Sequence, residues 1–258
     1  MLSVVYEVLD RQKRPLRNHH YLAFPKAGLA FAKIPGAPFE AMRPVLEQLG
    51  GIDGTRHDAL AADARGAHVW HGDTALLTAR ELKRRHPDFP VFTVIQSPAE
   101  RLARCYEVLI QGPEPLPAFF AERRFDKSMP LAKFVEQVAV IPDMRADNLV
   151  RSQTAILSYR GRLVPDLVLE INRLEADWWR LEDLVQDRSG RTIISGPQAV
   201  PVPSPSTLAR LQADDMTAAI ARRYKADLAR FFSVGRRTDE RIQKSRPPEP
   251  GLTLPSSA

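Results

Sequence analysis

Residues 88–110 read DFPVFTVIQSPAERLARCYEVLI, and this stretch predicts a strand that runs directly into a helix. The run at 91–95 is apolar, rich in β-branched residues and too short for a buried helix. Pro98 follows, and proline is favoured in the first turn of a helix. Apolar residues then recur at helical spacing, at Leu102, Cys105, Tyr106 and Leu109.

Gln96 and Ser97 fall between the predicted strand and the predicted helix. Ligands bind at such junctions in open α/β sheets, because the first amides of the helix are unpaired and its dipole is positive there. Arg101 and Arg104 follow on the helix as candidate contacts for an anion. The alternative is a structural strand and helix with arginines on its surface.

Other stretches predict the remaining elements of an α/β fold. Apolar runs of strand length occur at 21–24, 29–34 and 167–171. Helical periods occur at 39–49, 76–85, 131–140, 147–157, 176–185 and 216–231. Thr74 is the candidate cap of the 76–85 helix, and residues 111–130 form a proline-rich loop. This alternation favours a three-layer α/β domain with a mostly parallel central sheet.

The composition of the 258 residues bounds the class of protein. A single cysteine, Cys105, excludes an internal disulfide and a cysteine-cluster metal site, which suits a reducing compartment. Glu7 and Asp10 stand where a signal peptide would need an apolar core, and no apolar run reaches the ~18 residues of a membrane span. We therefore expect a cytoplasmic protein without a membrane span.

The net charge of +6 is concentrated near the end of the chain. Residues 222–246 hold nine basic and three acidic residues, a balance equal to the net charge. Such a segment can attract nucleic acid or anionic lipid, but few aromatics interrupt it, so no specific nucleic-acid site is expected. Residues 247–258 hold four prolines and predict disorder. We expect one domain over 1–235 and a basic, then proline-rich tail over 236–258.

Five stretches, in order, resemble the carbohydrate-type sulfotransferases, including their soluble bacterial relatives. These enzymes transfer a sulfuryl group from 3′-phosphoadenosine-5′-phosphosulfate (PAPS) to an acceptor hydroxyl. The nearest resemblance is FTVIQSPAERLARCY at 92–106. The others are LAFAKIPGAPFEAM at 29–42, ADNLVRSQTAIL at 146–157, VPDLVLEINRLEADW at 164–178 and IARRYKADLARF at 220–231.

The resemblance implies a P-loop-like fold, PAPS as co-substrate, no metal, and a hydroxyl acceptor for which a carbohydrate is the candidate. It places the 5′-phosphosulfate at the loop 35–38 and the 3′-phosphate at the junction after the 91–95 strand. The binding residues so implied are Pro35, Gly36, Ala37, Gln96, Ser97, Arg101 and Arg104.

The catalytic candidates are Lys33 and His71. Lys33 lies three positions before Gly36, and Lys26 is the alternative if the other loop is used. His68 and His71 lie in GAHVWHGD, which resembles the segment that carries the base in the glycan enzymes. An imidazole suits proton abstraction from a hydroxyl, whereas the alternative is a histidine held by ordinary hydrogen bonds. His19 and His20 receive no functional role.

Five positions differ from the pattern of the family. Gly36 stands at the loop lysine, Gln96 and Arg104 at an arginine and a serine of the 3′-phosphate site, and Asn148 and Asn172 at a histidine and a glutamate. Pro38 also removes an amide donor from the loop. Sulfuryl transfer requires positive groups on the leaving phosphate and a base on the acceptor.

Two hypotheses remain open. The chain is a PAPS-dependent transferase with an altered donor site, or it is a catalytically impaired relative that serves as a binding or interaction scaffold. A different P-loop activity ranks last, because the sequence contains no GxxxxGK[ST] motif.

Overall fold

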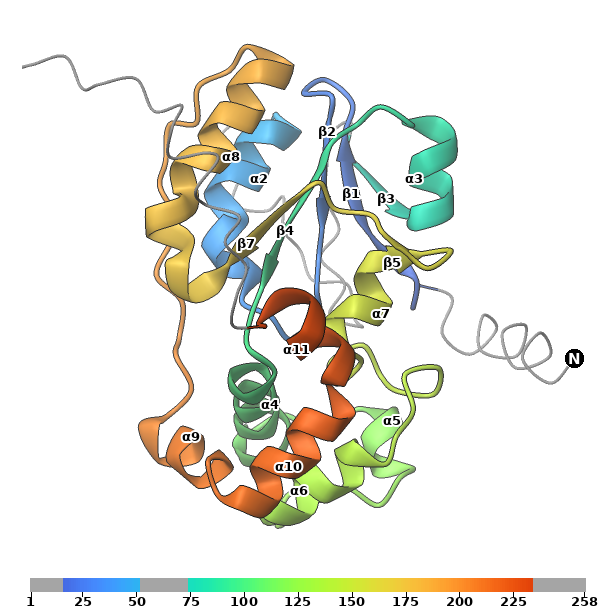
Figure 1. Cartoon of the computed structure of the whole chain (residues 1–258), viewed down its shortest axis with the longest axis vertical. Coiled ribbons are helices and arrows are strands. Elements are labelled where there is room, and N and C mark those ends of the chain that lie inside the picture. The colour runs from blue at the N-terminus through green and yellow to red at the C-terminus, as the bar shows by residue number, and fades with distance from the viewer. Residues whose placement is uncertain (1–15, 52–73, 234–258) are drawn as a thin grey trace, which may run out of the picture.

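The computed structural model describes residues 16–51 and 74–233, which form a five-stranded sheet flanked by helices (Figure 1). The strand order is β3-β1-β2-β4-β7. The strands are β1 (His19–Phe24), β2 (Leu29–Ala32), β3 (Ala75–Thr78), β4 (Val91–Ile95) and β7 (Leu167–Glu170).

The sheet is mixed, which corrects the expectation of a mostly parallel sheet. β2 pairs with β4 and β4 with β7 in parallel, whereas β1 is antiparallel to both β2 and β3. The reason is the short PKAG connection between β1 and β2, because a parallel pair needs a crossover of about a dozen residues. The α/β class itself is confirmed.

Helices cover both faces of the sheet. The helices α2 (Arg43–Gly50) and α8 (Leu174–Ser189) pack on one face, over side chains such as Phe31 and Phe92. The opposite face is covered by α3 (Ala79–Arg85), α7 (Gln153–Leu157) and α11 (Lys225–Phe231). Because successive side chains of a strand point to opposite faces, the one sheet contributes side chains to two hydrophobic cores.

A third core lies beyond the carboxyl end of the parallel strands. The helix α4 (Pro98–Tyr106) leaves the sheet directly after β4 and ends in a π-helical turn, Glu107–Gln111. Around it pack α5 (Ala118–Ala121), α6 (Leu131–Ala139), α9 (Pro205–Leu211) and α10 (Asp214–Arg223) (Figure 1). These helices form a cap at the end of the sheet where the candidate site lies.

Several element boundaries differ from the sequence predictions. Leu76 belongs to β3, and the helix that follows starts at Ala79 with Thr78, not Thr74, as its cap. The Thr78 hydroxyl accepts the Glu81 amide at 3.2 Å, and the Glu81 carboxylate accepts the Thr78 amide at 2.9 Å. The pairing of the four residues of β3 with β1 thus takes priority over the local helical period.

The predicted 147–157 and 216–231 helices are also shorter than expected. The first is helical only in α7, and the second is divided at Tyr224 into α10 and α11. The turns Phe39–Met42 and Ile171–Arg173 are 3-10 helices, and β5 (Ser158–Tyr159) and β6 (Arg162–Leu163) form a small hairpin. Within the described ranges, no helix is long and apolar enough to cross a membrane.

Candidate functional site

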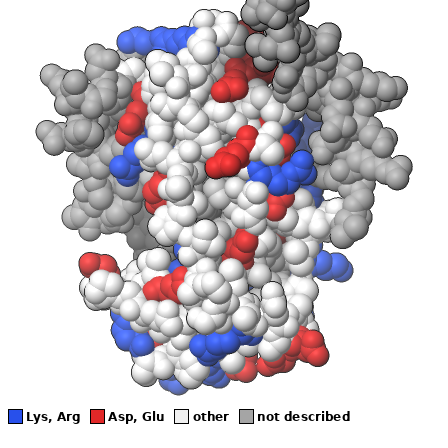
Figure 2. All heavy atoms as spheres, turned by 90° about the vertical axis from the view of Figure 1, so that its left-hand side faces the viewer, with Lys and Arg blue, Asp and Glu red and all other residues white. Residues whose placement is uncertain are grey.

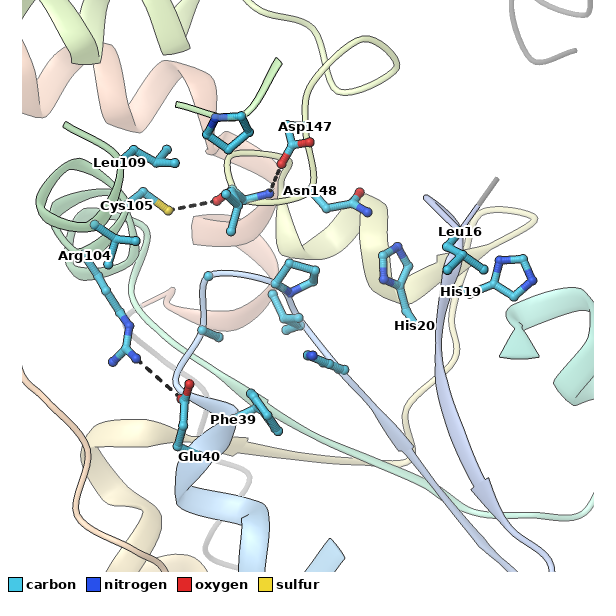
Figure 3. A pocket seen from close by; sticks show the side chains of 18 of the residues that line it. Leu16, His19, His20, Phe39, Glu40, Arg104, Cys105, Leu109, Asp147 and Asn148 are labelled. Carbon is cyan, nitrogen blue, oxygen red and sulfur yellow. Dashed lines mark hydrogen bonds and ion pairs between the residues drawn. The ribbon is translucent and has the colours of Figure 1, made fainter. Parts of the chain in front are cut away.

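A cavity of about 620 Å³ lies beyond the carboxyl end of β2 (Figure 3). Its walls come from the start of β1, the loop 33–40, the helix α4 and the segment 147–149. Polar side chains on the walls belong to His19, His20, Lys33, Glu40, Arg104, Asp147 and Asn148. Its size is that of a small-molecule pocket. We call this cavity the β2 pocket.

Lys33 is the residue that directly follows β2, and it lines the β2 pocket. Its amide donates to the His20 carbonyl at 2.7 Å, so the two residues lie opposite each other on antiparallel strands. The Lys33 ammonium lies 4.3 Å from the centroid of the Phe39 ring. Burial lowers the pKa of Lys33 to about 8, and the negative charge of Glu40 opposes this shift.

Arg104 points toward the loop side of the β2 pocket. Its Nη2 lies 3.5 Å from Glu40 Oε2, and its Nη1 donates to the Pro201 carbonyl at 3.0 Å (Figure 3). The sequence hypothesis placed Arg104 at the 3′-phosphate of a nucleotide. The structure instead pairs it with a carboxylate next to the 35–38 loop.

Arg101 is 2 % exposed and is held by backbone carbonyls. Its guanidinium donates to the carbonyl oxygens of Pro35 at 2.8 and 3.2 Å, Asn148 at 2.6 Å and Arg151 at 2.6 Å. Four of its five N–H groups are therefore occupied by protein atoms. Predicted as a ligand contact, Arg101 instead fastens the loop 35–38 to the segment 148–151.

Gly36 lies where the loop passes closest to neighbouring chain. Its φ is 81°, and a Cβ there would lie 3.1 Å from the Leu149 carbonyl oxygen and 3.2 Å from Cys105 Sγ. A lysine at this position, as in the family pattern, would be strained by the backbone and blocked by packed atoms. Lys33, three positions earlier in the chain, is instead the lysine that lines the pocket with this loop.

The segment 148–151 forms one wall of the site without regular secondary structure. Its four successive carbonyl oxygens accept side-chain donors: Arg101 at Asn148 and Arg151, Cys105 at Leu149, and Tyr224 at Val150. Buried carbonyls outside helices and sheets need such partners. Burial raises the pKa of the Cys105 thiol to about 11, so this cysteine is a donor and not a nucleophile at neutral pH.

Asp227 completes the support of this wall. It is fully buried, and its carboxylate accepts the amides of Gln153 at 2.9 Å and Thr154 at 2.7 Å at the start of α7. Tyr224 and Asp227, which carry the resemblance in the closing helix, therefore position the pocket wall from a distance.

His20 and Asn148 are pocket residues that the sequence reasoning missed. His20 is 4 % exposed and hydrogen-bonds to the Arg17 backbone, and Asn148 Nδ2 donates to the Arg17 carbonyl at 2.7 Å. The sequence did contain a signal that could have placed His20 in the pocket. In an antiparallel hairpin of β1 and β2, the register puts His20 opposite Lys33, on the same face of the sheet. Asn148 had been considered only as a substituted position.

Burial also makes His20 a source of acid sensitivity. Its pKa is lowered to about 3 by burial, and the charges of Arg151, His19 and Arg17 lower it further. The unfolded chain therefore binds a proton below about pH 6.5 that the folded chain rejects, so the free energy of unfolding falls as the pH drops. Between pH 7 and pH 5 we expect a loss of about 2 kcal/mol from this residue.

Urea denaturation of the wild type and of His20→Gln at pH 7 and pH 5 measures this effect. The variant should lose about 2 kcal/mol less than the wild type over this interval, whatever its stability at pH 7. His86→Gln is the matched control, and it should keep the full loss of the wild type. An equal loss in His20→Gln and the wild type would contradict the neutral, buried imidazole.

The second junction, after β4, has a different chemical character. Gln96 is buried, and its backbone N–H and C=O both bond the Gln153 side chain, at 3.1 and 2.8 Å. Ser97 caps α4, since its hydroxyl accepts the Glu100 amide at 3.3 Å and donates to the Glu100 carboxylate at 2.8 Å. The other Glu100 oxygen accepts Asn172 Nδ2 at 2.9 Å.

This junction is acidic. Burial raises the pKa of the Glu170 carboxyl. The positive charge of Arg173 opposes this shift, whereas the negative charges of Glu100 and Asp177 add to it. A carboxylate of the chain therefore already occupies the amino end of α4, where the resemblance places a 3′-phosphate. Neither Gln96 nor Ser97 is among the described residues that line the β2 pocket.

The predicted site residues are thus brought together only in part. Lys33, Pro35, Gly36, Ala37 and Arg104 line the β2 pocket, whereas Gln96, Ser97 and Arg101 serve other contacts. His68 and His71, like the tail at 236–258, lie outside the described residues. The part of the chain that the structure describes holds no group of three or more His, Cys, Asp or Glu suited to a metal ion.

Comparison with known proteins adds no relative. No family model, no curated protein and no solved structure matches the chain.

On the face shown in Figure 2, positive and negative side chains are interspersed among uncharged ones. The β2 pocket is therefore the feature from which a function can be argued.

Proposed function

We propose that the chain is a sulfotransferase-like protein that binds a small molecule bearing phosphate or sulfate in the β2 pocket. We further propose that it has lost recognition of the 3′-phosphate of PAPS, and is in that respect an impaired relative. The observation that carries the proposal is the contrast between the junctions: Lys33 lies on the pocket wall beside the 35–38 loop, while Glu100 fills the amino end of α4.

The charges on the pocket wall favour an anion near Lys33. Glu40 is paired with Arg104 at 3.5 Å, and Asp147 accepts the Leu149 amide at 2.9 Å. Lys33 Nζ has no described residue within hydrogen-bond or ion-pair distance, so it is the wall cation that is open to a ligand. The apolar remainder of the wall suits the body of a small molecule.

PAPS-dependent sulfuryl transfer is the second candidate, and the same lysine favours it. In that reaction the acceptor oxygen attacks sulfur, the bond from sulfur to the phosphate oxygen breaks, and 3′-phosphoadenosine-5′-phosphate (PAP) leaves. Lys33 would stabilise the charge on the leaving phosphate, and the acceptor proton would pass to a base. The resemblance assigns that base to His71. The carboxylates at the second junction oppose this candidate, since they would repel the 3′-phosphate.

Thermal scans with AMP, PAP and inorganic sulfate separate the two candidates. Ligand at a hundred times its dissociation constant stabilises the native state by about 2.7 kcal/mol, which is roughly 5 to 10 °C for a domain of this size. We expect PAP to give no larger shift than AMP at equal concentration, because the 3′-phosphate finds carboxylates at the second junction.

Lys33→Gln should abolish the shift, and Lys133→Gln on the exposed face of α6 is the matched control that should keep it. A much larger shift with PAP than with AMP would instead support the transferase. No shift with any of the three would contradict anion binding in the β2 pocket.

A further inference from the structure

The Lys33 amine has surroundings that differ from those of a surface lysine. It lies on the wall of a cavity of about 620 Å³, over the Phe39 ring and across the hairpin from the buried His20. The neighbouring carboxylate of Glu40 is engaged with Arg104, and no described residue bonds the amine directly. The amine is thus held at a ligand cavity without a fixed partner.

We propose that the Lys33 amine is a nucleophile that forms a reversible imine with a small, apolar aldehyde in the β2 pocket. The aldehyde carbon would meet Nζ, and its apolar tail would pack on wall residues such as Leu22, Ile34 and Leu76. This activity does not depend on the anion binding proposed above.

The reaction requires a neutral amine, and the site supplies one near physiological pH. With a pKa of about 8, roughly one Lys33 in ten is neutral at pH 7, against about one in three thousand at the ordinary value of 10.5. A desolvated lysine in a cavity is a known route to an activated amine. The position of the Lys33 amine in the cavity and its neutral fraction therefore both favour nucleophilic attack.

The step balances without an oxidant, a reductant or a metal. The nitrogen lone pair attacks the carbonyl carbon, and the carbonyl oxygen takes a proton to give a carbinolamine. The C–O bond then breaks, both hydrogens of the amine leave with the oxygen as water, and a C=N bond remains. Hydrolysis reverses the sequence, so the product is found only if the imine is trapped.

Reductive trapping tests the proposal on the full-length wild-type protein. The protein is treated with propanal and sodium cyanoborohydride at pH 7, and propylated lysines are located and timed by peptide mass spectrometry. Lys33 should be modified at least about ten-fold faster than the exposed Lys133, because of its larger neutral fraction. Its rate should also rise with a midpoint near pH 8, and the rate advantage should vanish in denaturant.

A Lys33 rate equal to or below that of Lys133, or an advantage that persists in denaturant, would overturn the proposal. Lys33→Arg keeps a cation in the pocket and should remove the fast phase. The outcome is separable from the proposed function, because the trapping assay contains no anionic ligand. Fast trapping without a thermal shift from AMP, PAP or sulfate would support the imine and refute anion binding. A thermal shift without fast trapping would support anion binding and refute the imine.

Discussion

Arg101→Met is expected to lower the free energy of unfolding by about 3 to 5 kcal/mol, because three backbone carbonyls around a buried side chain would lose their donor. Methionine fills a similar volume, so the effect reports the four lost hydrogen bonds more than an empty cavity. The melting temperature should fall by about 10 °C for a domain of this size. Urea denaturation and thermal scans measure the change.

Arg104→Met is the matched control on the same helix. Arg104 makes one carbonyl bond and a 3.5 Å ion pair at a partly exposed position, so its loss should cost less than about 1 kcal/mol. Equal losses in the two variants would contradict the structural role of Arg101. So would an Arg101→Met protein that melts like the wild type but no longer responds to AMP.

Asp227→Ala is expected to cost about 3 to 4 kcal/mol. Two amides at the start of α7 would lose their acceptor inside the protein, and the positive end of that helix would lose a carboxylate. Asp227→Asn keeps one acceptor oxygen and should cost about half as much. The free energies come from urea denaturation at pH 7.

The control for this helix-end effect is Asp215→Ala in the exposed first turn of α10, which has no side-chain cap. This substitution should change the stability by less than about 0.5 kcal/mol. If Asp215→Ala and Asp227→Ala behave alike, the buried carboxylate does not hold the pocket wall.

The parts of the fold that local sequence determines were predicted well. The strand at 91–95 and the start of α4 at Pro98 agree with the structure, because an apolar run and a proline in the first helical turn are local signals. The hairpin of β1 and β2 follows from a short turn, but its consequence for sheet direction was not drawn. The strand β3 was missed, because only pairing with β1 reveals it.

The site was harder to predict, because its residues are defined by distant partners. Lys33 and the 35–38 loop could be placed from the end of one strand. The sequence could not tell whether Arg101 faces a ligand or protein carbonyls, since its acceptors lie 47 to 66 positions away. The sequence prediction gave Glu100 no role in the site, although its position three residues after Ser97 is that of a capping partner.

The dependence of the 148–154 segment on Tyr224 and Asp227 has a consequence for how the protein is made. A chain still emerging from the ribosome has β1, β2, β4 and α4 long before it has these two residues. Until they arrive, the carbonyl of Val150 and the amides that start α7 lack their partners. The pocket wall is therefore completed only after Tyr224 and Asp227 have been synthesised, and a chain that stops short of Tyr224 would carry the sheet but not a finished pocket.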